Sequence, residues 1–298
     1  MSETKQRLNS LSDPKARRAL HKLFGDNTPQ IVRTLFDYTN GNIGTATGAG
    51  LSPQIWSDCP RGLMLVDPTV GHFVGDDFTL ANGESFTTAK NYTLAGANGL
   101  FTHVASDPNG VALCNAQATD NNECNVNVNS GVGLVTLSGT STWWFEARVK
   151  LNQITTGQGA FVGLVGDQIT LGVDFMTDTT MALKVQDVLG FQVISPAGAI
   201  VAAWQAMYNK TAGTRTVANA TAAATSTGWI KLGMKCRTNG TVGTITYYVN
   251  GESDANTILT SATNFPEDLY AVPAFAIKCG SAAANTLSVD WWYAAQLR

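Results

Sequence analysis

This chain of 298 residues has few charged side chains, few histidines and no long apolar run. Asp, Glu, Lys and Arg make up 14% of it, against about a quarter in an average soluble domain, and glycine, alanine, threonine and asparagine fill the difference. The formal net charge is −3, which gives the molecule as a whole no electrostatic attraction for nucleic acid. We therefore expect a surface solvated by hydroxyl and amide groups, and no nucleic-acid partner.

Apolar segments long enough to enter a membrane are also missing. No stretch approaches the roughly 18 apolar residues of a membrane span, and the first residues contain no apolar core of a secretory signal. The sequence therefore predicts neither a transmembrane helix nor a membrane partner. We expect the chain to be made in the cytoplasm and to leave it only as part of a particle.

The five cysteines are odd in number and widely spaced, which argues against a disulfide framework. The three histidines have no metal-ligand spacing with them, so a zinc site is not expected. The acidic cluster at residues 120–123 is compatible with a calcium site, although a loop of Asp and Asn is more often a solvated turn. We expect no metal and no cofactor.

Two C-terminal segments have the pattern of adjacent strands. In the first, residues 229–251, Leu232, Met234 and Cys236 alternate with charged residues, as a half-buried strand requires, and Asn239-Gly240 allows a hairpin turn. In the second, Val289, Trp291 and Tyr293 alternate with polar residues and with Trp292. This alternation predicts that Trp291 points into the core and that Trp292 points outward.

Further short strands alternate around Phe145, around Phe161, and over residues 169–175, 181–185 and 191–194. Residues 197–227 are compatible either with strands joined by a long loop or with a short helix around 202–208. Together with the 229–251 hairpin and the Asp290-Trp291-Trp292 strand, these segments resemble the concanavalin A-like (laminin G and legume-lectin) jelly rolls, as found in virion proteins of tailed phages. The resemblance covers roughly residues 76 to 298. It implies an all-β antiparallel sandwich, but such sandwiches serve as lectins, hydrolases and structural modules alike.

The first 75 residues differ from the rest. Residues 1–25 are predicted to form a helical arm, because Ser12-Asp13-Pro14 supplies a helix start and Gly25 a stop. Residues 1–24 have a local charge of +4, and the remaining 274 residues therefore have −7. Basic and apolar side chains of this arm are the candidates for docking on an acidic surface, although an exposed basic helix without a partner fits as well. They are Lys5, Arg7, Lys15, Arg17, Arg18, Lys22, Leu20, Leu23 and Phe24.

Residues 26–75 contain many helix and strand breakers, which predicts an extended segment. The segment also contains Ile55, Trp56 and Leu63 among many other apolar residues, too many for a free linker, so we expect it to lie along another surface as an anchor.

Catalytic patterns are not found. A glycosidase on this fold needs two carboxylates facing one cleft, and in the glucanase branch of the family they come from a Glu-x-Asp-x-x-Glu run, which this sequence lacks. Glu146, Asp174 and Asp290 are the strongest remaining candidates, and each is as well explained by a turn or surface position. We therefore expect no catalytic residue.

Exposed aromatics are the other candidates for function. Trp56, Trp144 and Trp292 are expected to lie in contacts between subunits, with sugar stacking as the alternative. The favoured hypothesis is a non-enzymatic virion protein, a capsid decoration or head-fibre protein that forms a dimer or trimer and binds the major capsid protein or another virion protein. The alternatives are a carbohydrate-binding tail or receptor-binding module and, third, a glycan hydrolase.

Overall fold

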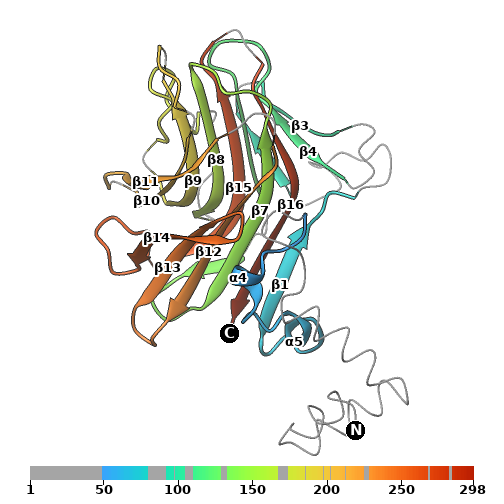
Figure 1. Ribbon diagram of the computed structural model, residues 1–298, viewed down its shortest axis with the longest axis vertical. Helices are drawn as coiled ribbons and strands as arrows, with labels where there is room; N and C mark the ends of the chain where they lie inside the picture. The colour runs from blue at the N-terminus through green and yellow to red at the C-terminus, as the bar shows by residue number, and fades with distance from the viewer. Residues whose placement is uncertain are drawn as a thin grey trace, which may run out of the picture.

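The computed structural model describes residues 49–79, 92–96, 98–104, 110–128, 133–166, 174–184, 186–196, 198–201, 203–211, 213–224, 228–267, 269–281 and 284–298. Two eight-stranded antiparallel sheets pack face to face around one large hydrophobic core (Figure 1). The predicted all-β sandwich is therefore confirmed. No helix in these ranges is long and apolar enough to cross a membrane.

Two short helices, α4 (Pro53–Trp56) and α5 (Arg61–Val66), precede the strands. Sheet A contains, in spatial order, β14 (Glu252–Leu259), β13 (Gly243–Val249), β12 (Ile230–Thr238), β7 (Trp143–Leu151), β16 (Thr286–Leu297), β4 (Ala112–Asn115) and β3 (Leu100–His103), with β1 (Gly71–Asp76) also paired to β16. Sheet B contains β11 (Thr216–Ala223), β10 (Ala203–Asn209), β9 (Val188–Ser195), β8 (Gln158–Gly166), β15 (Leu269–Cys279), β5 (Glu123–Val128) and β2 (Tyr92–Ala95), with β6 (Val135–Leu137) paired to β15.

The predicted hairpin of residues 229–251 is present as β12 and β13. Leu232, Met234 and Cys236 are fully buried in the core between the sheets, as their alternation requires. The turn that joins the strands contains Gly240 at a φ of +94°, a conformation that glycine adopts without strain. The segment from 197 to 227, for which the sequence left helix and strand open, contains β10 and β11.

In the closing strand β16, the faces predicted for Trp291 and Trp292 are wrong. A β-bulge between Val289 and Trp291 shifts the register of β16 against β7 by one residue. As a result Trp292, not Trp291, shares the inward face with Val289, and its Nε1 donates to the Tyr92 hydroxyl at 2.8 Å in the core. Trp291 lies on the outer face of sheet A. Strict alternation gave the wrong face because the sequence does not mark the extra residue.

The segment before the sandwich also differs from expectation. Its described part, residues 49–75, contains α4 and α5, and β1 pairs with β16 from Gly71↔Leu297 to Asp76↔Trp292, so the sandwich begins before residue 76. In Figure 1, β1 lies beside β16, with α5 near its lower end. The predicted arm of residues 1–25 lies outside the described residues, as does most of the predicted strand over 169–175. Residues 181–184 form no strand, only a single bridge between Met176 and Leu183.

Candidate functional site

Residues 49–70, here called the strap, cover part of the outer face of sheet A. A second, smaller hydrophobic cluster forms there between the strap and the sheet; it contains Ile55, Trp56, Cys59, Met64, Trp144, Tyr248 and Ala295. Ile55 can reach the sheet because β12 has a glycine at this point. A Cβ added to Gly233 would lie 2.4 Å from Ile55 Cδ1, so a larger residue would push the strap away.

Glu146 is the polar centre of this contact. It follows Phe145 on β7 and so points to the outer face, where its Oε2 accepts hydrogen bonds from the Ser52 backbone N–H at 3.0 Å and from Trp56 Nε1 at 2.8 Å. Burial raises the pKa of Glu146, and the hydrogen bonds from the strap and the nearby Lys231 ammonium oppose that rise. The carboxyl group therefore holds the strap on the sheet and is closed to a substrate.

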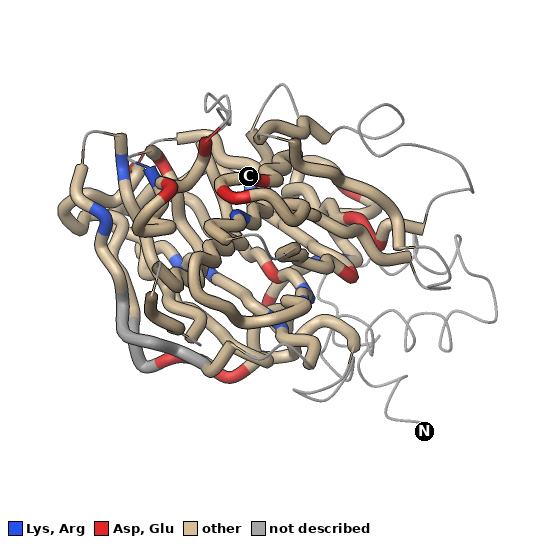
Figure 2. The backbone as a smooth tube through the Cα atoms, turned by 90° about the horizontal axis from the view of Figure 1, so that it is seen from above, with Lys and Arg blue, Asp and Glu red and all other residues tan. Residues whose placement is uncertain are grey.

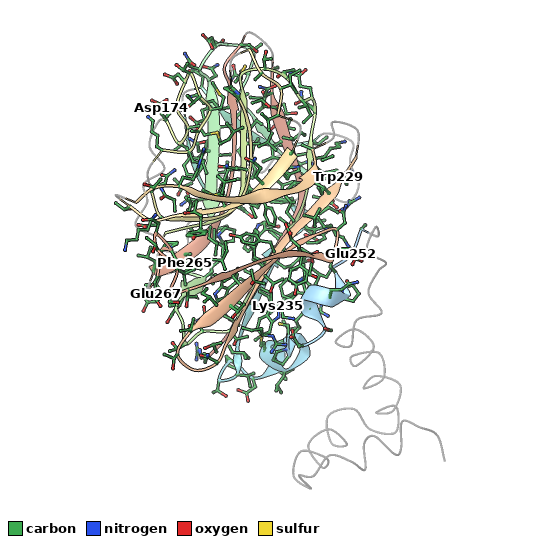
Figure 3. The ribbon with its side chains drawn as sticks, turned by 60° about the vertical axis from the view of Figure 1, so that its left-hand side comes forward. Asp174, Trp229, Lys235, Glu252, Phe265 and Glu267 are labelled. Carbon is green, nitrogen blue, oxygen red and sulfur yellow. The ribbon has the colours of Figure 1, made fainter. Side chains whose placement is uncertain are left out.

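Asp58 of the strap makes the second polar contact. Its Oδ1 accepts from Trp144 Nε1 at 2.9 Å, and its Oδ2 pairs with Lys235 Nζ at 2.8 Å and with Arg237. In Figure 3, Lys235 lies beside the short helices of the strap. At the start of the strap, Trp291 Nε1 donates to the Ala49 carbonyl at 2.7 Å. Lys231 Nζ donates to the carbonyl of the next residue, Gly50, at 3.0 Å, so two adjacent residues fix the start of the strap on sheet A.

Residues 174–184, here called the cover segment, lie on the outer face of sheet B. Glu123 of β5 anchors this segment, because its Oε1 accepts the backbone N–H groups of Phe175 and Met176, each at 3.0 Å. On the neighbouring strand β15, Lys278 donates to Glu123 Oε2 at 3.2 Å and to Asp178 Oδ1 at 2.8 Å. Glu123 and Lys278 are both completely buried.

Small residues on sheet B make room for the cover segment. Phe175 packs edge-on against Phe161 of β8, with ring centroids 5.4 Å apart. A Cβ on Gly159 would lie 2.4 Å from the Met176 sulfur, and one on Gly280 would lie 2.3 Å from Met181 Cε. The glycines of this face therefore admit the Phe and Met side chains of the cover segment.

Other outward side chains of sheet B are buried as well. Val165, Gln192, Met207 and Ala276 come from four adjacent strands, and each is at most 1% exposed. Tyr270 differs from the other large apolar residues of β15, because it is 60% exposed. Within the described part of the chain, the outward side chains at the centre of this face are therefore buried.

Glu146 and Asp290 come from neighbouring strands of sheet A, and Asp174 lies over the other sheet. Glu146 lies under the strap on sheet A. Asp290 sits at the bulge of β16 and pairs with Arg148, while Asp174 belongs to the cover segment and pairs with Lys184 at 3.3 Å and with Lys278 at 3.8 Å. Figure 3 shows Asp174 at the end of the molecule opposite the strap. No group of metal-ligating side chains was found within the described ranges.

The three tryptophans expected at a subunit contact are buried within this chain. Trp56 and Trp144 belong to the cluster under the strap, at 1% and 0% exposure, and Trp292 belongs to the main core at 4%. The expectation that these three tryptophans are exposed is therefore wrong, for two reasons. The strap covers one outer face, and the bulge turns Trp292 inward. The docking residues proposed on the N-terminal arm all lie outside the described residues.

Glu123, Lys278 and Asp58 were not identified from the sequence. A weak signal exists for Lys278, a single charge in the otherwise apolar run of β15, because a buried lysine needs a partner. Its partner lies 155 residues away in the sequence, inside the acidic cluster interpreted as a turn or a calcium loop. No local pattern links the two.

No family model and no curated protein sequence matches this chain. A solved protein of unknown function from Shewanella oneidensis MR-1 is 17% identical, with coverage of 77% of this chain and 87% of that one and a TM-score of 0.50. An endo-1,3-β-glucanase from Streptomyces sioyaensis is 15% identical, with coverage of 75% and 95% and a TM-score of 0.51. A non-specific endo-β-1,3(4)-glucanase of family GH16 is 12% identical, with coverage of 78% and 93% and a TM-score of 0.51. At these identities the likeness is one of fold, and the fold of this chain is the concanavalin A-like jelly roll.

Proposed function

We propose that this chain is a non-catalytic structural protein of a virus particle, a capsid decoration or head-fibre protein attached through its N-terminal region. One observation supports this proposal above the others. The chain covers part of each outer face of its own sandwich, and the buried carboxylates Glu123 and Glu146 hold the covering segments in place. Groups that a hydrolase would need free are thus part of the scaffold.

The argument against hydrolysis is geometric. Glycosidases cleave with two carboxyl groups separated by about 5 Å for retention and up to about 9.5 Å for inversion, both facing one cleft. Glu146 lies on sheet A under the strap, Asp174 lies in the cover segment over sheet B, and Asp290 is paired with Arg148.

Attachment through the N-terminal region is supported by the strap. Because Trp291 and Lys231 hold the carbonyl groups of Ala49 and Gly50, residues 1–48 join the sandwich at a fixed point on sheet A. Helix α5 of the strap exposes Leu63, Leu65 and Val66 by 50%, 68% and 77%. A basic N-terminal arm and an apolar helix on the same segment suit an acidic protein surface with apolar contacts, such as a capsid lattice or another virion protein.

The test is co-sedimentation of the purified chain with particles that lack it. We expect the full chain to bind, and a variant with Lys15, Arg17, Arg18 and Lys22 replaced by glutamate to lose binding while keeping its melting temperature. The matched control replaces Lys150, Lys184, Lys210 and Arg298 of the sandwich by glutamate. Equal binding by both variants would refute docking by the arm. Sedimentation equilibrium of the free chain tests the proposed dimer or trimer.

A second candidate function is glycan binding without cleavage. Its support is Trp229, a half-buried ring on sheet A beyond the strap, with Arg148 at 4.7 Å and Lys150 at 5.0 Å from the ring centroid. An aromatic ring beside cationic donors suits an acidic sugar. A glycan array separates the candidates: binding lost in Trp229→Ala favours a lectin-like role, and no binding leaves the structural role.

A further inference from the structure

Lys278 of β15 is a completely buried lysine, and its amino group lies between a glutamate and an aspartate. Its Nζ is 3.2 Å from Glu123 Oε2 and 2.8 Å from Asp178 Oδ1. The side chains of Lys278 and Glu123 are 0% exposed, whereas that of Asp178 is 55% exposed. One amino group therefore contacts both a buried carboxyl group and a second carboxyl group that is open to solvent.

The cover segment holds Asp178 in this position. The two halves of the segment are joined by hydrogen bonds, from the Thr177 N–H to the Ala182 carbonyl at 2.8 Å and from the Lys184 N–H to the Phe175 carbonyl at 3.0 Å. Asp178 lies in the turn that these bonds close. Its carboxyl carbon is one bond away from the oxygen that contacts the lysine nitrogen. Groups held this closely within one chain react with effective molarities that reach about 10⁵–10⁸ M.

We propose that Lys278 and Asp178 form an isopeptide bond in the folded chain, with Glu123 transferring a proton. An ammonium and a carboxylate become one amide and one water, so the reaction needs no oxidant and no other reactant. The Lys278 nitrogen forms a bond to Asp178 Cγ, and the bond from Cγ to one of its oxygens breaks. Two of the three ammonium protons leave with that oxygen as water, and the third stays on the amide nitrogen.

Glu123 is placed to move one of these protons. Its Oε2 accepts a hydrogen bond from the Lys278 ammonium, so it can take a proton, free the nitrogen lone pair for attack and return the proton to the departing oxygen. Burial raises the pKa of Glu123 to about 7, although Lys278 opposes the rise, and such a group exchanges protons near neutral pH. Burial lowers the pKa of Lys278, but its bonds with Asp178 and Glu123 raise it overall, so the neutral amine is a minor species. We therefore expect the bond to form slowly, after the chain has folded.

Asp174 is the other acid near the lysine, and its position is less suitable. Its Oδ1 is 3.8 Å from Lys278 Nζ, and its Oδ2 pairs with Lys184 at 3.3 Å. The remaining neighbour of Nζ is the backbone carbonyl of Asn121 at 3.4 Å, which accepts a hydrogen bond and has no oxygen that can leave as water. The geometry therefore selects Asp178 as the partner.

The bond would attach the cover segment to β15 covalently. It would close a loop of roughly a hundred residues and so restrict the unfolded chain, as other cross-links do. The inference goes beyond the proposed function and does not depend on it, because it rests only on the contacts of Lys278. A chain that forms the bond but binds no particle would refute the proposed function alone.

The test is peptide mapping of the full chain after incubation at neutral pH, together with its intact mass. We expect the mass to fall by one water, and a branched peptide to join Lys278 to Asp178. Trypsin should no longer cleave after Lys278, because its side chain is then an amide. The linked chain should melt about 10 °C above the Asp178→Ala variant.

Two variants and a control locate the reaction. Asp178→Ala and Glu123→Gln should each keep the full mass, whereas Asp120→Ala, which removes an exposed acid close to Glu123 in the sequence, should form the bond as the unchanged chain does. The peptide map of the unchanged chain decides the question even where a variant folds poorly. An unlinked Lys278 in the folded, unchanged chain, or a bond from Lys278 to Asp174, would overturn the inference. A bond that still forms at the same rate in Glu123→Gln would overturn the role given to Glu123.

Discussion

Glu123 and Lys278 face each other on neighbouring strands of sheet B, completely buried, with Oε2 and Nζ 3.2 Å apart. Other hydrogen bonds of the pair reach outward to the cover segment, through the N–H groups of Phe175 and Met176 and the carboxylate of Asp178. A buried charge without these partners would be costly. The pair therefore attaches a loop to a sheet, which is a structural role.

This pair predicts a pH dependence. Burial raises the pKa of Glu123 to about 7 from an ordinary value of 4.5, although Lys278 and the backbone N–H groups oppose the rise. Burial lowers the pKa of Lys278, but its bonds with Asp178 and Glu123 raise it overall, so this ammonium stays charged. The folded state thus holds the Glu123 proton more tightly than the unfolded state. Its contribution to stability is complete below about pH 4.5 and is lost as the pH rises through about 7.

We expect Glu123→Gln to flatten the dependence of unfolding free energy on pH between 4.5 and 7, relative to the unchanged chain, in urea titrations at several pH values. Glu252→Gln, an exposed glutamate on β14, is the control and should change nothing. An unchanged slope in the Glu123 variant would show that its carboxyl group titrates alike in both states.

The bulge in β16 predicts unequal costs for two adjacent tryptophans. Trp292→Ala removes a ring from the main core and should lower the free energy of unfolding by about 3–5 kcal/mol. Trp291→Ala should cost about half as much, because its ring lies on the outer face and loses one hydrogen bond to Ala49. Urea unfolding measures both. A larger loss for Trp291 would mean that the faces are assigned the wrong way round.

The contacts of the strap predict that replacing Glu146 loosens the strap and leaves the sandwich folded. Replacement by alanine leaves the Ser52 N–H and the Trp56 Nε1–H buried without an acceptor. Each unsatisfied donor costs about 1–3 kcal/mol of stability. We expect trypsin to cleave Glu146→Ala after Arg61 before it cleaves the sandwich. Mass spectrometry of the fragments detects this. Glu252→Ala should be cut at the same rate as the unchanged chain, and equal protection of both variants would contradict the assigned role.

The non-catalytic proposal predicts no hydrolysis. Purified protein should release no reducing sugar from β-1,3- or β-1,3(4)-glucan, because the candidate carboxylates Glu146, Asp174 and Asp290 are each paired or covered. A release of sugar that disappears in Glu146→Ala, Asp174→Ala or Asp290→Ala would identify a catalytic acid that the geometry does not suggest.

Local patterns predicted much of the fold and little of the candidate site. The alternation of Leu232, Met234 and Cys236 identifies an inward face because its period depends only on the strand itself. The faces of Trp291 and Trp292 could not be predicted, since one unpaired residue in a bulge reverses the alternation. Glu123 and Lys278 meet only in the folded chain.

The same limit applies to the basic arm and the strap. The sequence shows that residues 26–75 are too apolar for a free linker, but not that their described part packs on this chain's own sheet. Lys, Arg, Asp and Glu are interspersed along the described sandwich in the view of Figure 2. The excess of positive charge lies in residues 1–24, and a binding experiment tests whether these residues dock on a partner.

The most direct test of a structural role is quantitative mass spectrometry of gradient-purified virus particles from a host lysate that contains this chain. The proposal predicts peptides of the chain in the particle fraction at a fixed ratio to the major capsid protein. Particles made with the arm variant, in which Lys15, Arg17, Arg18 and Lys22 are glutamates, should lack these peptides. Finding the chain only in the soluble fraction, with none on the particles, would contradict the account.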